Sequence, residues 1–268
     1  MTGGTLRDRC PACGSADLAE VFTRAEWRDA ALRERRDAWA AMEADPELAF
    51  DAFLRCGACG TLFTDRVPPP AALGRFYGAY SGTARSLAKI KSKLGLETRR
   101  LFCLRLAVRG RRFLDVGSGI GCAVEAARRN GFAAAGIEPG ADAVEIARRH
   151  FPRNEYFVGT LDALPAGRQF DLVQCVEVLE HVPNPQRLVA QLAAAVAPGG
   201  LLFLTTPDAG HHTVRGDPLR WGMVCPPEHL TLFTRDGVRA ALAPHFHRVI
   251  VLPNRKPGVR VLAFKGKN

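Results

Sequence analysis

The segment Phe113-Leu-Asp-Val-Gly-Ser-Gly-Ile-Gly121 joins an apolar strand to a turn with glycine at every second position, and this combination is the strongest indication of the fold. Glycines let a ligand lie directly against the backbone, and the helix that follows such a turn points its free N–H groups at that ligand. A dinucleotide fingerprint G-x-G-x-x-G would need glycine at the position of Cys122. The pattern is instead D-x-G-x-G-x-G, and Asp115 suits a ligand with a cationic end better than a pyrophosphate.

Further apolar segments predict more strands, several of which end in an acidic residue. Residues 133–137 lead into Glu138, which is placed to accept two ribose hydroxyls. Residues 156–162, 170–177 and 199–208 predict the third, fourth and fifth strands. Helical patterns alternate with these strands, which indicates a largely parallel sheet covered on both faces. The last two strands, 247–252 and 259–265, are joined by six residues, enough for a hairpin and too few for a crossover.

The ordered motifs resemble the class I S-adenosylmethionine-dependent methyltransferases, in particular the bacterial small-molecule branch that includes the ubiquinone-pathway enzymes. The motifs are D-V-G-S-G-I-G, G-I-E-P, L-D-A-L-P, F-D-L-V-x-x-x-E-V-L-E-H-V and P-G-G-L-L-F-L-T-T-P. The resemblance covers residues 99–268 and implies an α/β fold: a seven-stranded, mostly parallel Rossmann-like sheet with one antiparallel strand and helices on both faces.

The resemblance also implies where S-adenosylmethionine would bind. Its methionine part falls to the glycine turn, its ribose to the second strand end, its adenine edge to the third and its sulfonium to the fourth. The residues are Asp115, Gly117, Ser118, Gly119, Glu138, Pro139, Leu161, Asp162, Cys175, Val176 and Glu177. Methyl transfer to a lone pair needs alignment and a route for a proton, and no metal.

The general base is predicted in the segment after the fifth strand. Two prolines precede Glu228 and His229, and Thr234 with Asp236 caps the next helix, so this segment should be held rigidly. Relatives often carry a histidine there that faces the acceptor. We therefore favour His229 as base, with Glu228 orienting it, and His181 as its rival.

Three other side chains near the predicted site have alternative roles. Tyr80 either closes over the sulfonium through its ring face or belongs to the core of a lid that covers the cofactor in relatives. His211 and His212 are adjacent, and adjacent side chains usually point apart. We expect them to be exposed loop histidines and not metal ligands.

Two matching knuckles, Cys10-Pro-Ala-Cys13-Gly and Cys56-Gly-Ala-Cys59-Gly, predict a four-thiolate zinc site in residues 1–66. A redox-active pair or four metal-free thiols are the alternatives. A helix is expected between the knuckles, with its core side chains at helical spacing: Trp27, Leu32, Trp39 and Met42. The remaining cysteines are expected to be small buried residues: Cys103, Cys122, Cys175 and Cys225.

Composition and charge indicate how the chain is organised and which classes of partner it is expected to have. Val67-Pro-Pro-Pro70 marks a stiff linker, so we divide the chain into a zinc-binding module (1–66), a linker with lid helices (67–98) and a catalytic domain (99–268). The net charge is +10, and residues 85–112 hold nearly all of it. This segment is either a collector for an anionic partner or a solvated helical face. There is no apolar run of 18 residues and no signal-peptide pattern, so a cytoplasmic protein without a membrane partner is expected.

The function expected from these features is methylation of a small polar acceptor: a sugar, a nucleotide sugar, or a natural-product hydroxyl or amine. An RNA methyltransferase that grips its substrate with the zinc module and the basic segment is the second hypothesis. It lacks the Asn/Asp-Pro-Pro-aromatic signature where Cys175-Val-Glu-Val stands, which argues against base N-methylation but not against ribose methylation. Nucleic acid is not the expected partner, because Phe102 is the only aromatic residue interleaved in the basic segment. A non-enzymatic zinc-ribbon protein is the third, and the intact residues Asp115, Gly117, Gly119 and Glu138 argue against it.

Overall fold

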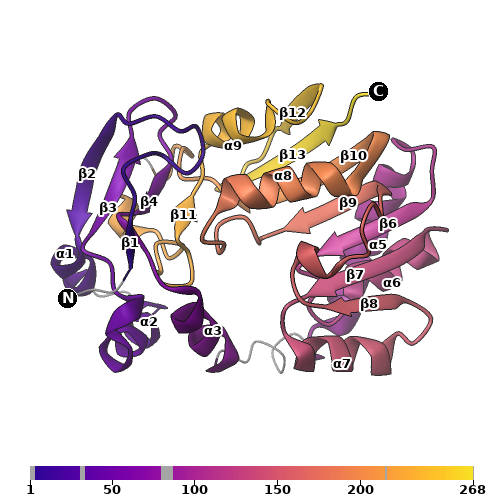
Figure 1. Cartoon of the computed structure of the whole chain (residues 1–268), viewed down its shortest axis with the longest axis horizontal. Helices are drawn as coiled ribbons and strands as arrows, with labels where there is room; N and C mark the ends of the chain where they lie inside the picture. The colour runs from indigo at the N-terminus through magenta and orange to yellow at the C-terminus, as the bar shows by residue number, and fades with distance from the viewer. Residues whose placement is uncertain (1–3, 31–33, 80–86, 215, 268) are drawn as a thin grey trace.

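The computed structural model describes residues 4–30, 34–79, 87–214 and 216–267, and its largest element is a seven-stranded sheet (Figure 1). The strand order is β12-β13-β10-β9-β6-β7-β8. Strands β8, β7, β6, β9 and β10 pair in parallel, and β13 is antiparallel to both of its neighbours, which confirms the predicted sheet and hairpin. The bounds are β6 Arg112–Val116, β7 Ala133–Glu138, β8 Glu155–Val158, β9 Phe170–Val176, β10 Val196–Pro207, β12 Arg248–Leu252 and β13 Gly258–Phe264.

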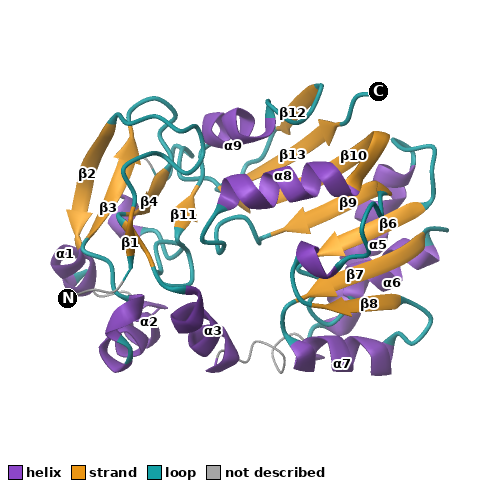
Figure 2. Cartoon of the chain, viewed as in Figure 1, coloured by secondary structure: helices purple, strands orange, loops and turns teal. Residues whose placement is uncertain are grey.

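Helices cover both faces of this sheet (Figure 2). Side chains alternate along each strand: Leu114 and Val173 pack into the same core cluster as α8 and α9, whereas Phe113 and Leu172 pack with α5 and α6. Burial on both faces explains why these strands are almost continuously apolar. The helices are α5 Ile90–Arg105, α6 Cys122–Arg129, α7 Ala141–His150, α8 Pro185–Ala195 and α9 Arg235–Leu242.

A second, antiparallel sheet holds the N-terminal part of the chain, in the order β11-β4-β3-β2. Three of its strands come from the predicted module: β2 Leu18–Thr23, β3 Ala52–Cys56 and β4 Leu62–Thr64. The fourth, β11 (Thr231–Leu232), comes from far downstream and pairs with β4. A small ladder joins β1 (Thr5–Leu6) to β5 (Arg66–Val67), and α3 (Pro70–Ala79) follows.

The predicted helix between the knuckles is two helices, α1 (Arg24–Asp29) and α2 (Glu34–Ala44). A capping box between Thr23 and Glu26 starts α1, and Ala30 leaves it with extended backbone angles, so the helix ends there. Trp27 and Met42 are buried as expected, whereas Leu32 lies outside the described residues.

The segment that links β10 to α9 packs against the small sheet. Val224 and Leu230 share a core cluster with Phe53 and Trp27, and the Trp27 indole donates a hydrogen bond of 2.9 Å to the Val224 carbonyl. The N-terminal module therefore braces the chain that carries His229.

Two local predictions about the cysteines and the caps have clear outcomes. Thr234 caps α9 by accepting a hydrogen bond from the Gly237 N–H, as predicted. Cys103 is exposed on α5, so the expectation that it is buried is wrong, because that helix turns its other side to the sheet.

No helix in the described part of the chain is both long enough and apolar enough to span a bilayer.

Candidate active site

The glycine turn between β6 and α6 has a backbone that other residues would strain. Gly117 and Gly119 have φ values of +75° and +49°, in the left-handed region. A Cβ on Gly117 would lie 2.4 Å from a methyl carbon of Val178, whereas the position beside Gly119 is open to 4 Å. The Gly117 and Ser118 N–H groups both donate to the Ile137 carbonyl, which ties the turn to β7. The turn therefore offers open space beside its backbone at Gly119.

Glu138 is fixed at this opening by two backbone groups. Its carboxylate accepts hydrogen bonds from the Gly119 N–H of the glycine turn at 3.0 Å and from the Gly140 N–H, just beyond Pro139, at 3.1 Å. The structure thus brings together the first and second predicted strand ends. A carboxylate held in this way keeps lone pairs for further donors.

Asp115 lies buried beneath the turn among other carboxylates. The Gln174 amide donates to Asp115 at 3.3 Å and to Glu97 at 3.4 Å, and Glu97 also pairs with Arg100 at 3.1 Å. Burial, with a smaller contribution from the charge of Glu97, raises the pKa of Asp115 well above its usual range. A cationic group bound here would offset that cost.

The third strand is shorter than predicted, and its terminal acid has protein partners. After Val158 the chain forms a 3₁₀ turn, Leu161–Ala163, in which Leu161 is buried. The Asp162 carboxylate accepts hydrogen bonds from Arg187 at 3.1 Å and Gln191 at 2.7 Å, both on α8. Asp162 is therefore held by α8 at the edge of the site.

The end of β9 carries backbone strain. Cys175 is fully buried, which raises the pKa of its thiol, and Val176 ends the strand. Glu177 then has a φ of +53°, the only positive φ at a non-glycine residue among those described. Its carboxylate accepts a hydrogen bond of 2.7 Å from the Thr205 hydroxyl on β10. Such strain concentrates at functional sites, and here it follows the strand end at which the methyl donor is predicted.

His181 and His229 form a ring pair with centroids 4.7 Å apart. The Nδ1 of His181 lies 2.9 Å from the Glu228 carbonyl oxygen, and the Nδ1 of His229 lies 2.7 Å from the Met223 carbonyl oxygen. A carbonyl oxygen can only accept, so each Nδ1 carries the proton and each Nε2 keeps its lone pair. Burial lowers the pKa of both rings, that of His181 to about 4.

The orienting group of His229 differs from the prediction. The Glu228 carboxylate lies 3.8 Å from the Cys225 sulfur, and it is the backbone carbonyl of Glu228 that contacts a histidine, His181. The Met223 carbonyl instead holds His229, because the turn that the His229 N–H closes on the Cys225 carbonyl brings the ring back to Met223. This contact joins residues six positions apart, and no sequence pattern indicates it.

Glu180 completes this cluster and was not among the predicted site residues. Its side chain is fully buried, accepts a hydrogen bond of 2.9 Å from the Thr206 hydroxyl, and has its other oxygen 3.8 Å from the His181 Nε2. Burial, together with the nearby charge of Glu177, raises the pKa of Glu180 to about 8. At neutral pH the contact therefore joins a protonated carboxyl to a neutral imidazole. Candidate ligand atoms of Glu180, His181 and His229 lie within 4.8 Å of one another, a spacing that could also hold a metal ion.

A tyrosine reaches the histidine pair from α3. The Tyr77 hydroxyl donates to the Glu228 carbonyl at 3.1 Å, and its ring lies edge-on to His181 with centroids 6.4 Å apart. Tyr80, for which a role over the sulfonium is predicted, lies outside the described residues. Tyr77 precedes Tyr80 by three residues in the sequence.

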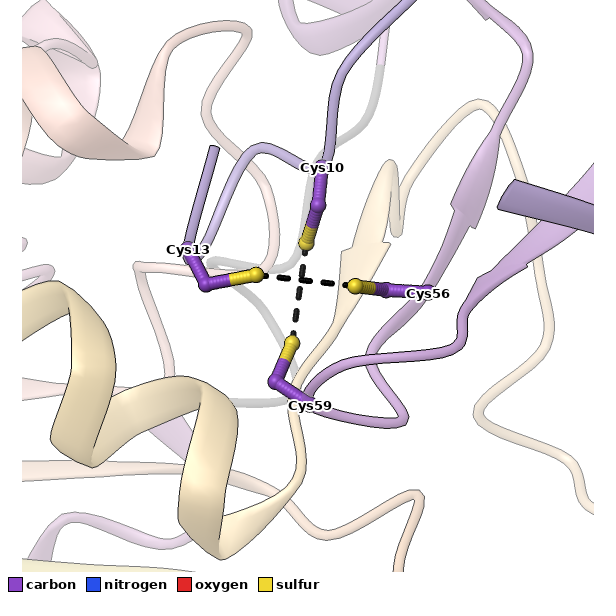
Figure 3. A group of neighbouring side chains, drawn as sticks. All are labelled: Cys10, Cys13, Cys56 and Cys59. Carbon is purple, nitrogen blue, oxygen red and sulfur yellow. Dashed lines mark hydrogen bonds between the residues drawn. The ribbon is translucent and has the colours of Figure 1, made fainter. Parts of the chain in front are cut away.

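The four cysteines of the two knuckles converge (Figure 3). Cys10 and Cys59 have sulfurs 3.6 Å apart, and those of Cys13 and Cys56 are 3.5 Å apart. A tetrahedral zinc with Zn–S bonds of about 2.3 Å separates its sulfurs by roughly 3.8 Å. All four are free cysteines, and both knuckles close through the same turn hydrogen bond, Gly14 to Cys10 and Gly60 to Cys56. The donor set and its spacing fit a tetrahedral zinc ion.

The expectation that both adjacent histidines are exposed holds for His212 and is wrong for His211. His211 is buried, and its ring centroid lies 4.2 Å from that of His212. The His211 Nδ1 lies 2.8 Å from the Thr213 hydroxyl, in a turn that Asp208 and His211 close through their backbone groups. This turn folds the two rings onto each other instead of letting them diverge.

Comparison with known proteins supports the methyltransferase resemblance, and the matched region includes the glycine turn. A family model described as "Methyltransferase domain" matches residues 85–244. The ubiquinone biosynthesis O-methyltransferase of Coxiella burnetii is 34% identical over 107 residues, 38% of this chain and 46% of that protein. The Klebsiella pneumoniae protein of the same name is 38% identical over 103 residues, 36% of this chain and 43% of that protein. The chain thus spans about half the length of the curated relatives it matches.

Solved structures share the fold at low sequence identity. A possible histamine N-methyltransferase from Thermotoga maritima superposes with a TM-score of 0.52 at 19% identity, over 71% of this chain and 96% of that one. The S-adenosylmethionine-dependent methyltransferase SibL gives a TM-score of 0.53 at 18% identity, over 73% of this chain and 61% of that one. Since the family match covers more than half of the chain and includes the glycine turn, Glu138 and the histidine pair, this protein belongs to the methyltransferase domain family.

Proposed function

We propose that this protein is an S-adenosylmethionine-dependent methyltransferase that acts on a small polar acceptor, such as a sugar, a nucleotide sugar, or a natural-product hydroxyl or amine. One observation carries the proposal: two backbone N–H groups hold the Glu138 carboxylate beside the open position at Gly119. A preorganised carboxylate next to a bare backbone suits a ribose diol followed by a chain that lies along the turn.

The cofactor would lie across the carboxyl ends of β6, β7 and β9. Asp115, whose buried carboxyl lies near the charge of Glu97, would attract the cationic amino group of the methionine part. Glu138 would accept hydrogen bonds from the ribose hydroxyls. Leu161 and Asp162 would border the adenine, and the strand end from Cys175 to Glu177 would lie at the sulfonium. When bound, the cofactor supplies an electrophilic methyl group whose loss leaves a neutral thioether.

The protein's own part in an O- or N-transfer is to orient the acceptor and remove its proton. His229 is neutral at pH 7, and its Nδ1 proton is committed to the Met223 carbonyl, so its Nε2 lone pair is free to accept the acceptor's proton. His181 is its alternative, since it has the same tautomer. Glu180 is buried and protonated, so it would keep negative charge away from His181 and leave that imidazole neutral.

We further propose that Cys10, Cys13, Cys56 and Cys59 hold one structural zinc ion. The ion would fasten the first knuckle to the β3–β4 hairpin, whose sheet continues into β11. Four protein thiolates leave no open coordination position, which favours a structural role over a catalytic one.

Cofactor binding to a Glu138 variant tests the central assignment. Glu138→Ala removes two charge-assisted hydrogen bonds to the ribose, each worth about 1.5–3 kcal/mol, so affinity for S-adenosylmethionine should fall at least about tenfold. Glu145→Ala, on the exposed side of α7, is the matched control. Titration calorimetry gives the affinity, and the melting temperature of each variant shows whether the turn survives. Wild-type affinity in folded Glu138→Ala would overturn the assignment.

A further inference from the structure

A polar cleft of about 490 Å³ lies beyond the carboxyl end of β10, away from the glycine turn. Its lining comes from three places: the turn after β10, the first residue of α9 and the β12–β13 connection. The side chains that line it are Asp208, His211, His212, Arg235, Asn254 and Arg255. None of them belongs to the predicted cofactor or base residues.

One arginine of the cleft is held in place from below. The Asp208 carboxylate, which is 1% exposed, accepts from Arg235 Nε at 3.1 Å and from the Gly210 N–H at 2.9 Å. Arg235 Nη2 also reaches the Asn254 carbonyl at 3.5 Å. The ion pair with Asp208 fixes the guanidinium and uses only one of its edges, so further N–H groups remain available to a ligand.

The second arginine supplies charge that the protein does not balance. Arg255 is exposed and has no hydrogen bond or ion pair with any residue in the described ranges. Lys256 follows it in the same turn and is also exposed. Since Asp208 already pairs with Arg235, the cleft carries an excess of positive charge before either histidine is counted.

The folded-over histidines add donors to the same cleft. His211 is buried with its Nδ1 beside the Thr213 hydroxyl, and the ring of the exposed His212 is tilted against it with centroids 4.2 Å apart. Two guanidinium groups and two imidazoles around one opening are the donor types that bind phosphoryl oxygens.

The cleft and the reaction site share strand β10. Thr205 and Thr206 donate to Glu177 and Glu180 in the site, and Asp208 follows them along the chain into the cleft. At about 3.3 Å per residue, Asp208 lies roughly 7–10 Å along the chain from these two threonines. One acceptor molecule of moderate length could occupy both.

We propose that this cleft binds a phosphate or diphosphate group of the acceptor, which makes the acceptor a phosphorylated or nucleotide-linked molecule. The proposal rests on the proposed function and narrows it. The phosphoryl group would lie between Arg235 and Arg255, and the atom to be methylated would lie near His229.

Binding of simple probes to the full-length, zinc-loaded protein tests this site without knowledge of the acceptor. Calorimetric titrations at fixed ionic strength would use inorganic pyrophosphate, UDP and uridine, with and without saturating S-adenosylmethionine. We expect pyrophosphate and UDP to bind, uridine to bind much more weakly, and the cofactor not to displace either anion. Absence of pyrophosphate binding, or its displacement by the cofactor, would overturn the proposal.

Arginine variants locate the binding. Arg255→Gln should weaken pyrophosphate and UDP about tenfold, because one charge-assisted contact is lost. Arg248→Gln, which removes the same charge from an exposed position at the start of β12, should leave both affinities unchanged. Equal affinities in Arg255→Gln and wild type would contradict the site. Arg235→Lys keeps the positive charge beside Asp208 but loses the planar set of guanidinium N–H donors. It should weaken the binding of both anions while the melting temperature is maintained.

The two proposals fail in distinguishable ways. If wild-type protein binds the cofactor but neither anion, the cleft assignment alone is wrong. If it binds the anions but not the cofactor, the proposed methyltransferase function is wrong. Once an acceptor is turned over, pyrophosphate should inhibit competitively with respect to it, and noncompetitive inhibition would show that the cleft takes free anions instead of the acceptor.

Discussion

Replacement of Glu180 by Gln should change how the stability of the protein depends on pH. The carboxyl is fully buried and has a pKa of about 8 in the folded protein, against an ordinary value of 4.5. A raised folded pKa contributes stability that is complete below pH 4.5 and is lost as the pH rises toward 8. Gln is uncharged at every pH, so Glu180→Gln removes this loss.

The magnitude follows from the shift in pKa. Each pH unit between 4.5 and 8 costs the wild type about 1.4 kcal/mol of unfolding free energy. His181 has a lowered pKa of about 4, so its contribution is complete above pH 6.5 and is lost as the pH falls toward 4. The two slopes oppose each other below pH 6.5. Of these two groups only Glu180 acts between pH 6.5 and 8, and the stability difference between variant and wild type should grow by about 2 kcal/mol in favour of the variant.

Urea unfolding followed by tryptophan fluorescence, at half-unit steps from pH 6.5 to 8, measures this difference. Glu145→Gln on the exposed side of α7 is the matched control, and its unfolding free energy should change with pH as that of the wild type does. Gln keeps an acceptor for the Thr206 hydroxyl, so the substitution should preserve this hydrogen bond. A pH-independent difference in unfolding free energy between Glu180→Gln and wild type would not affect the test, which depends on the slope with pH. If Glu180→Gln also runs parallel to the wild type over this range, the carboxyl is not protonated in the folded state and the reasoning is wrong.

Three further outcomes are expected. His229→Ala should retain cofactor affinity and lose about 10²–10⁴ in turnover with an active acceptor, measured by mass spectrometry; turnover within a few-fold of wild type, while His181→Ala loses it, would assign the base to His181. Elemental analysis should find about one zinc per chain, lost in Cys56→Ser, and metal-free protein with an unchanged melting temperature would contradict the structural role. Glu177→Gly should be about 1 kcal/mol more stable than Glu177→Ala in thermal unfolding, because only glycine adopts a φ of +53° without strain; the ordinary order, with Ala more stable, would argue against that backbone conformation.

The large sheet could be predicted because its signals are local. Each parallel strand is a short, mostly apolar segment, and the glycine turn marks where the first of them ends. The hairpin at the C-terminus followed from the length of one connection. Glu138 could be paired with the turn because a strand end and a glycine turn at neighbouring positions in a parallel sheet must meet at the same edge.

The base cluster could not be predicted in the same way, because its contacts join distant segments. Tyr77 meets Glu228 across 151 residues, and Gln174 bridges Asp115 to Glu97, which the sequence shows only as the single acid of a basic segment. The raised pKa of Glu180 depends on complete burial, which an isolated E-H pair after a strand does not reveal. Burial and long-range pairing are properties of the assembled core, and residue type at one position gives only a preference.

The position of β11 links the cysteine module to the acceptor side of the site. Thr234 donates to the Cys59 carbonyl in the second knuckle and caps α9, whose first residue, Arg235, lines the polar cleft. His229 precedes β11 on the same segment, so the knuckle holds both the candidate base and the cleft arginine. The glycine turn is tied instead to Ile137 in the large sheet. Removal of zinc should therefore weaken pyrophosphate binding before cofactor binding, and the module would act in catalysis by fixing the acceptor's half of the site.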